Sequence, residues 1–222
     1  MKIKSLSTLQ LVEKQATKWR MQNYDQEIKV PKIPVITISR ESGCGGGIVA
    51  DKIAAKLGLD LFHQEVVHQI AKSAHVSTFL VESLDERGLS MVEDWITAMI
   101  NERHLWPDEY SQILMKVIGT IGRHGHAVLV GRGANFILPR DNRFRVRLVA
   151  DQTFRIHQVA SAKKVSLDEA KRKVVQTDAD RKSFIRKYFN ADINNPCNYD
   201  LVIDIHTLGI DKTADLVCSV FK

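Results

Sequence analysis

A cluster of glycines between a strand pattern and a helix pattern most constrains how this chain can fold. Four glycines fall within residues 43–47, directly after the apolar, β-branched run Val35 to Ile38 and before a helical pattern that ends at Gly58. This order predicts a strand, a glycine-rich turn and a helix. Glycine lets a ligand approach the backbone closely, and the helix directs unpaired amides and its positive dipole end at the turn. The stretch therefore predicts an anion site, for which a nucleotide phosphate is the commonest ligand.

The spacing approaches the phosphate-loop pattern of NTPases, in which a glycine and four further residues precede Gly-Lys-Ser/Thr. Arg40 stands where the first glycine would be, Gly46 where the lysine would be, and Gly47 where the magnesium-binding hydroxyl would be. A glycine-rich corner that binds nothing is therefore the alternative. Four glycines weigh against that alternative, because each carries a backbone entropy cost unless the fold or a ligand needs it.

Length and composition favour one large domain, or one domain with an arm, in a reducing compartment. The chain has 222 residues, 44% of them hydrophobic, and a formal net charge of +6, which favours anionic ligands without demanding nucleic acid. Its three cysteines are far apart and have neither metal-site nor disulfide spacing. No signal-peptide core and no membrane-length apolar run is apparent. We expect a cytoplasmic protein without membrane contact.

The pattern along the chain divides it into an arm and a main domain. Residues 5–24 carry helical periodicity, and the polar stretch 25–34 contains two prolines, so residues 1–32 are expected to form a helical arm and linker. The arm is expected to pack on the main domain, 33–222, or on a second subunit, which would make a homodimer. Residues 77–124 read as a helical insertion, with helices near 77–86, 90–104 and 108–123.

Strand patterns alternate with helix patterns through the main domain. After Val35 to Ile38, strands are expected at 126–130, 144–149 and 201–204, with helices at 64–74, 151–162, 166–190 and 211–221. This alternation predicts a parallel sheet covered on both faces, a three-layer α/β/α fold. Ligands of such sheets bind outside the carboxyl ends of the strands, where Arg40, Arg132 and Asp151 fall. Arginines alternate with apolar residues in 144–149, so one face of that strand is expected to be wet or to face a ligand.

Several motifs together resemble the cytidylate kinase-like family of P-loop nucleoside monophosphate kinases. The loop of that family reads Ser-Arg-Glu/Gln-x-Gly-Ser/Ala-Gly-Gly, and Ser39 to Gly46 match it with Cys44 at the small position. The resemblance covers roughly residues 8–222. Its other motifs are Gly131-Arg132-Gly133, Tyr199 to Asp204, Leu84-Asp85-Glu86, Arg155, Asp178-x-x-Arg181 and Tyr188-Phe189.

The resemblance implies a P-loop kinase fold and the ATP-dependent transfer of a γ-phosphate to CMP or another small acceptor. Arg132 would hold the acceptor phosphate, and Arg40 or Arg132 would replace the missing lysine. Residues 151–192 would form a lid that brings Arg155, Arg181 and Arg186 over the transferring phosphate, with Asp178 and Asp180 pairing with these arginines. His63 and Asp178 would contact the acceptor. The donor triphosphate would bind the loop residues Ser42, Gly43, Cys44, Gly45, Gly46, Gly47 and Ile48.

Magnesium is expected with ATP, and its ligands stay open among Glu41, Asp151 and Asp204. A thiolate at Cys44 would be favoured by the helix N-terminus and would be redox-sensitive, although a small loop filler is the preferred interpretation. His63 has the alternative of a surface or packing role.

Two further functions remain as alternatives to the kinase. A catalytically inactive nucleotide sensor would keep the glycine loop without the lysine and the hydroxyl. A nucleic-acid-binding protein is less favoured, because the basic residues are not interleaved with aromatic ones and no recognition helix is apparent.

Overall fold

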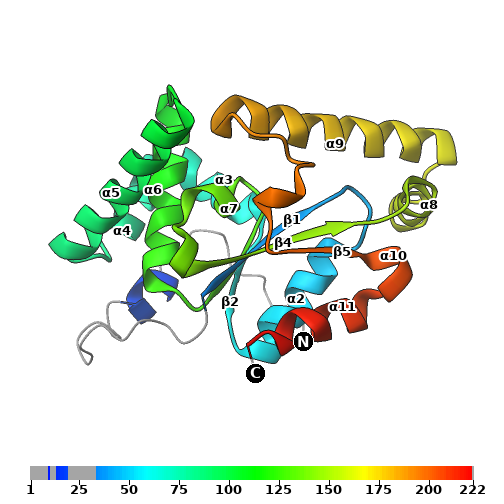
Figure 1. The fold of residues 1–222 in the computed structure, drawn as a ribbon, viewed down its shortest axis with the longest axis horizontal. Coiled ribbons are helices and arrows are strands. Elements are labelled where there is room, and N and C mark those ends of the chain that lie inside the picture. Colours follow the sequence, from blue (N-terminus) through cyan, green and yellow to red (C-terminus); the bar gives the residue numbers. More distant parts are fainter. Residues whose placement is uncertain (1–9, 11–13, 20–33, 222) are drawn as a thin grey trace.

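A five-stranded parallel sheet forms the centre of the computed structural model, which describes residue 10, residues 14–19 and residues 34–221 (Figure 1). The strand order is β2-β3-β1-β4-β5, so the strand that leads into the glycine loop lies in the middle. All adjacent pairs are parallel. The strands are β1 (Val35–Arg40), β2 (Asp60–Phe62), β3 (Ala127–Val130), β4 (Arg143–Val149) and β5 (Leu201–Asp204).

Helices cover both faces of this sheet because side chains alternate along its strands. In β3, Val128 and Val130 pack into one hydrophobic cluster with α2 (Gly46–Leu57) and α11 (Ile210–Ser219), while Leu129 packs into the other. Figure 1 shows α2 and α11 on one side of the sheet and α3 to α7 on the other. The expected three-layer α/β/α kinase-type fold is confirmed. The second layer contains α3 (Gln64–Lys72), α4 (Ala74–Val81), α5 (Glu86–Arg103), α6 (Glu109–His124) and the short α7 (Ala134–Ile137).

A helical hairpin follows β4 and lies across one end of the molecule. It consists of α8 (Gln152–Lys163) and the 23-residue α9 (Leu167–Phe189). Ser166, where the helix was expected to begin, caps α9 by accepting a hydrogen bond from the Glu169 amide. The hairpin has a small core of its own, formed by Val159, Ala170 and Val174. Short helices complete the chain at η1 (Arg140–Asn142), η2 (Pro196–Asn198) and α10 (Ile205–Leu208).

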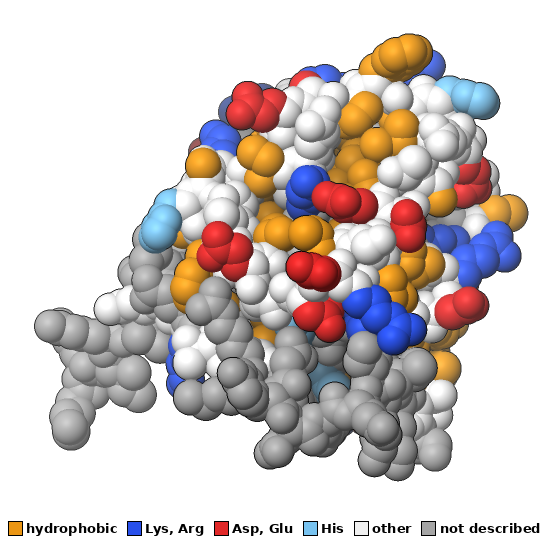
Figure 2. Space-filling model, turned by 90° about the vertical axis from the view of Figure 1, so that its left-hand side faces the viewer, with side chains coloured by type: hydrophobic (Ala, Val, Ile, Leu, Met, Phe, Trp, Pro, Cys, Tyr) orange, Lys and Arg blue, Asp and Glu red, His pale blue; other side chains and the backbone are white. Residues whose placement is uncertain are grey.

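The region expected as a helical insertion is helical in the structure, and Figure 2 views the molecule from the side on which its helices lie. The break that precedes it lies at Ser73 rather than at the expected 75–76. We expected helices at 64–74 and 77–86, whereas α3 ends at Lys72 and α4 spans Ala74–Val81. Ser73 causes the break, because its extended backbone and hydroxyl cap α4 at the Val76 amide. The helices expected at 90–104 and 108–123 correspond to α5 and α6.

The described part of the N-terminal arm packs on the main domain at the β2 edge of the sheet. Ala16 and Trp19 are buried, and the Trp19 ring stacks on His124 at a centroid distance of 4.1 Å. Lys18 pairs with Asp60 of β2. The rest of the expected 5–24 helix and nearly all of the linker lie outside the described residues. The homodimer through this arm stays a prediction. Among the described helices, none combines the length and the apolar character needed to span a membrane.

Candidate functional site

The glycine loop joins β1 to α2 and has free amides at its helix end. Gly43 and Gly45 take left-handed φ angles of 81° and 86°, as the sequence led us to expect of this turn. The Ser42 amide donates a hydrogen bond of 2.7 Å to Asp178 Oδ1. Within the described part of the chain, no protein group accepts a hydrogen bond from the amides of Gly47 and Ile48. These amides are therefore available to an anion at the N-terminus of α2.

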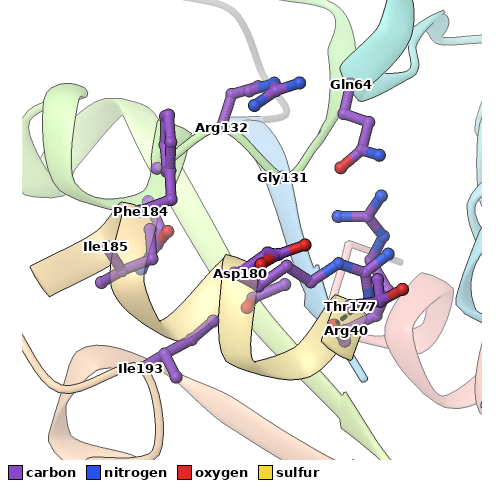
Figure 3. Close-up of a pocket in the computed structure, with 13 residues that line it drawn as sticks. Arg40, Gln64, Gly131, Arg132, Thr177, Asp180, Phe184, Ile185 and Ile193 are labelled. Carbon is purple, nitrogen blue, oxygen red and sulfur yellow. Dashed lines mark hydrogen bonds between the residues drawn. The ribbon is translucent and has the colours of Figure 1, made fainter. Parts of the chain in front are cut away.

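Arg40 takes the space beside the loop in which a lysine at position 46 would begin. A Cβ atom on Gly46 would lie 2.8 Å from Arg40 Cβ and 3.0 Å from Arg40 Cγ. At its other end, Arg40 Nη1 lies only 2.5 Å from the position of a Cβ on Gly131. The Arg40 side chain thus runs from the start of α2 to the end of β3, and both glycines are needed for it to do so. Figure 3 shows its guanidinium near Gly131.

Burial and neighbouring positive charge weaken the hold of Arg40 on its proton. Burial, followed by the charge of Arg181, lowers the pKa of Arg40 from its ordinary value to about 10. Burial is also the main cause that lowers the pKa of Arg181, whose Nη1 donates to the Arg40 carbonyl over 2.9 Å. Both groups remain cations at neutral pH. Two buried guanidinium groups side by side favour an anionic ligand between them.

A cavity of about 360 Å³ opens at the carboxyl ends of β1 and β3 (Figure 3). We call it the first cavity. Arg132 enters it from a strained turn, because its φ of 54° is left-handed like those of Gly131 and Gly133 on either side. A Cβ on Gly133 would lie 2.0 Å from the Phe189 ring, so glycine is required there. The cavity is lined by Ser39, Arg40, Gln64, Gly131, Arg132, Gly133, Asn135, Thr177, Asp180, Arg181, Phe184, Ile185 and Ile193.

Two buried hydrogen-bond donors of residues that line the first cavity have no acceptor among the described residues. They are Arg132 Nε and Asn135 Nδ2, and Asn135 is only 6% exposed. Leaving a buried donor unsatisfied costs about 1–3 kcal/mol. The first cavity is therefore suited to a ligand that carries acceptor oxygens. Asn135 was missed from the sequence, where a lone asparagine after Gly133 carries no signal.

A second cavity, of about 190 Å³, adjoins the first and shares Arg40, Arg181 and Ile193 with it. It lies between the loop, β4 and α9. Its lining consists of Arg40, Glu41, Arg147, Asp178, Ala179, Arg181, Lys182, Ile193 and Asn194. Neither cavity is lined by residues 43–48, so the free loop amides lie beside the two cavities rather than inside them.

Arg155 ties the hairpin to the glycine loop. Its Nη1 donates to Asp178 Oδ2 over 2.6 Å and to the Ser42 carbonyl over 3.0 Å, and its Nε lies 3.3 Å from Glu41 Oε2. The Arg155 side chain is buried and lines neither cavity. The expected pairing of Asp178 with a hairpin arginine is confirmed. Asp180 instead accepts a hydrogen bond from Gln176.

The remaining residues proposed from the sequence lie in different surroundings. Arg181 lines both cavities, whereas Arg186 is exposed and lines neither. The His63 ring lies 3.2 Å from Asp51 on α2, and its neighbour Gln64 lines the first cavity in its place. Of the two lid arginines Arg181 and Arg186, only Arg181 therefore lines a cavity.

Carboxylates do not gather into a metal site in the described part of the chain. Glu41 accepts from the Ala150 amide and pairs with Arg155. Asp151 caps α8 and Asp204 caps α10. No group of three or more metal-binding side chains is found among the described residues. Each of the three carboxylates considered for Mg²⁺ therefore already accepts a hydrogen bond from a backbone amide of the protein.

The surroundings of Cys44 agree with the preferred interpretation of a small loop filler rather than with a reactive thiolate. Burial raises the pKa of the Cys44 thiol, and this outweighs the hydrogen bond from the Gly46 amide, which lowers it. The side chain is 1% exposed and its Sγ lies 3.9 Å from the Leu148 carbonyl oxygen. Cys44 therefore serves as a small buried residue under the loop.

Comparison with known proteins assigns the chain to a family. The model of the cytidylate kinase-like family matches residues 35–207, which include the loop, both cavities and the hairpin. The chain belongs to this family. No curated protein matches the chain.

One solved structure shows the same fold at low sequence identity, and two others are more distant. An uncharacterized protein from Eubacterium ventriosum has a TM-score of 0.68 and 21% identity over 85% of this chain and 97% of its own. A shikimate kinase from Bacteroides thetaiotaomicron has a TM-score of 0.46 and 13% identity, covering 84% of this chain and 97% of its own. A dephospho-CoA kinase from Campylobacter jejuni has a TM-score of 0.34 and 13% identity, with coverages of 85% and 97%.

Proposed function

We propose that this member of the cytidylate kinase-like family is an ATP-dependent phosphotransferase that transfers the γ-phosphate of ATP to CMP or another small anionic acceptor. The observation that carries the proposal is the course of Arg40, from the space beside Gly46 to Gly131 at the mouth of the first cavity. A cation in that position lies between the loop amides, where ATP would bind, and the cavity, where the acceptor would bind.

Phosphoryl transfer depends mainly on positioning and on the neutralisation of charge. The amides of Gly47 and Ile48 would hold the donor phosphates, and Arg40 would stabilise the charge of the transferring group. The planar guanidinium of Arg132 suits bidentate contact with an acceptor phosphate. Arg181 would add a second cation on the α9 side, and Asn135 Nδ2 a neutral donor. ATP is expected to bring Mg²⁺ with it, and no residue of the chain is assigned to that ion.

One observation favours the second candidate, an inactive nucleotide sensor. The Asp178 carboxylate accepts a hydrogen bond from the Ser42 amide at the start of the loop. Its negative charge there opposes the approach of a polyphosphate. A loop with this contact and without a lysine could bind nucleotide weakly and leave it unreacted.

Calorimetric titration of ATP and a coupled assay of ADP release over a panel of nucleoside monophosphates, both with Mg²⁺, test the proposal. Wild-type protein is compared with Arg40→Met, Arg132→Met and the matched control Arg172→Met, an exposed arginine of α9 outside both cavities. Turnover that falls by roughly three decades in Arg40→Met and not in Arg172→Met supports the kinase. ATP binding without turnover favours the sensor. Absence of ATP binding overturns both.

A cytoplasmic location and a homodimer belong to the same proposal. The three cysteines, Cys44, Cys197 and Cys218, are all free, which suits a reducing compartment. Sedimentation of the full chain, compared with a chain that starts at residue 33, tests the homodimer. A mass that is monomeric for both would contradict it.

A further inference from the structure

The second cavity contains a buried cation for which the described residues supply no counter-ion. Arg147 of β4 is only 5% exposed. Its Nη1 donates to Ser39 Oγ over 2.8 Å and its Nη2 to Asn194 Oδ1 over 3.3 Å, both neutral acceptors. The Tyr199 ring lies 5.9 Å from the guanidinium carbon. No carboxylate of the described residues lies within ion-pair distance of Arg147.

The two carboxylates that line this cavity share a single cationic partner, and the lining holds twice as many cations as carboxylates. Both Glu41 and Asp178 pair with Arg155. The other charged groups of the lining are Arg40, Arg181 and Lys182, all positive, and the charge of Arg147 contributes to the lowered pKa of Arg181. A buried charge without a partner costs several kcal/mol, which neutral hydrogen bonds only partly offset. The second cavity therefore has an excess of positive charge.

We propose that the second cavity is a separate binding subsite for a phosphate-like oxyanion, and that Arg147 is its principal ligand. Its volume of about 190 Å³ is below the roughly 300 Å³ at which sites for drug-sized ligands begin, so it suits a single tetrahedral anion with water. Because Arg40 and Arg181 line both cavities, the oxyanion is either a free ion or a second phosphate group on a molecule held in the first cavity. The subsite does not depend on phosphoryl transfer, so it holds even if the proposed kinase activity fails.

Phosphate-dependent thermal stability of the full chain tests the subsite. Wild-type protein, Arg147→Met and the control Arg172→Met are melted in a phosphate-free zwitterionic buffer and across an inorganic phosphate titration at constant ionic strength. We expect the apparent phosphate affinity to fall on the order of tenfold to a hundredfold in Arg147→Met, because a hydrogen bond to a charged group is worth ~1.5–3 kcal/mol. Arg172→Met should behave as wild type.

A purely structural role for Arg147 predicts a different result. If Arg147 serves only to bridge Ser39 and Asn194 by hydrogen bonds, Arg147→Met is destabilised in phosphate-free buffer and keeps the wild-type response to phosphate. That result overturns the proposal. If Arg147 is an uncompensated cation, Arg147→Met is at least as stable as wild type without phosphate. The rise in its melting temperature on adding phosphate is then smaller than that of the wild type. Arg147→Lys, which keeps the charge, should retain part of the response even if the methionine variant folds poorly.

Tungstate, a tetrahedral oxyanion with a strong anomalous signal, separates this subsite from the loop and the first cavity. In crystals of the wild-type chain soaked in tungstate, a peak within hydrogen-bonding distance of Arg147 supports the proposal, and its absence overturns it. Repeating the phosphate titration in the presence of saturating CMP identifies the source of the oxyanion. If CMP abolishes the Arg147-dependent response, the oxyanion is a phosphate carried by the bound molecule. If the response persists, the oxyanion is a free ion. Either result supports the subsite.

Discussion

Replacement of Gly46 by alanine tests whether Arg40 and the loop interlock as described. An alanine Cβ at position 46 would meet Arg40 Cβ at 2.8 Å, a distance that real Cβ contacts essentially never show. The contact is with the stem of the arginine rather than its flexible end, so it is not relieved by a change of rotamer. The backbones of β1 and α2 would have to separate by roughly 0.6 Å to reach an ordinary 3.4 Å contact.

The expected loss of stability follows from two opposing effects. Overpacking of this kind costs ~1–3 kcal/mol. Alanine in place of glycine in a helix returns about 0.5–1 kcal/mol. We therefore expect Gly46→Ala to lower the free energy of unfolding by about 0.5–2 kcal/mol. For a chain of this length each kcal/mol corresponds to about 2–4 °C, so the melting temperature should fall by roughly 1–8 °C.

Gly47→Ala is the matched control, because a Cβ at position 47 meets nothing within 4 Å. That variant should be stabilised by about 0.4–1 kcal/mol through a less flexible unfolded chain. Urea denaturation of the two variants and the wild type measures the difference. Calorimetry should also show weaker ATP binding for Gly46→Ala, since Arg40 is displaced. Equal stabilities of the two alanine variants would refute the interlock of Arg40 with Gly46.

Two further predictions concern contacts outside the loop turn. Burial lowers the pKa of His124 from 6.5 to about 4. As the pH falls, His124 is therefore protonated in the unfolded chain before it is protonated in the folded one. The stability present above pH 6.5 should decline by ~3 kcal/mol as the pH falls to 4. His124→Phe should show a flatter profile in urea denaturation between these pH values, and an unchanged profile would contradict this cause. Asp178→Asn should lower the free energy of unfolding by about 1–3 kcal/mol, because Arg155 loses its 2.6 Å partner. The control Asp180→Asn alters only a contact with Gln176 and should be neutral, so equal losses in the two variants would argue against the Arg155 contact as the cause.

The layers of the fold could be predicted because four of the five strands carry their own local signal, whereas the three-residue β2 was not predicted. The apolar, β-branched runs of β1, β3 and β5 are bounded by turn residues, and the intervening helices have amphipathic periodicity. The break between α3 and α4 was expected at 75–76 but lies at Ser73, because the apolar periodicity passes through Ser73 without interruption. A capping hydroxyl inside a periodic stretch is locally indistinguishable from a polar residue on the wet face of one helix.

The arginines of the site show where a sequence reading stops. Arg181 lines the cavities together with Thr177 four residues before it and Ile185 four residues after it, which share one face of α9. Arg186 follows Ile185 directly and is therefore turned about 100° away from that face. The number of arginines in this segment did not distinguish Arg181 from Arg186. Their positions around the helix distinguish them once one residue of the face toward the cavity is known.

Arg147 was overlooked for a different reason. Within the pattern of β4 it alternates with apolar residues, so it was expected on a wet or ligand-facing side. The structure shows it buried, because Ser39 of β1 lies beside it in register and Asn194 closes over it. Its contacts come from residues 108 positions before it and 47 positions after it. Only the tertiary structure could show that the hydrogen-bond acceptors of Arg147 are neutral groups.

The departures of this loop from the phosphate-loop pattern are linked through one side chain. A lysine at position 46 would need a Cβ where the stem of Arg40 already lies, so the lysine and Arg40 exclude each other sterically. Arg40 replaces the first glycine of the pattern and Gly46 replaces its lysine, and these two replacements therefore depend on each other. The exchange keeps a cation beside the loop but moves its origin from the start of α2 to the end of β1. From there the guanidinium reaches Gly131 and both cavities, so loss of the motif's lysine does not mean loss of its charge.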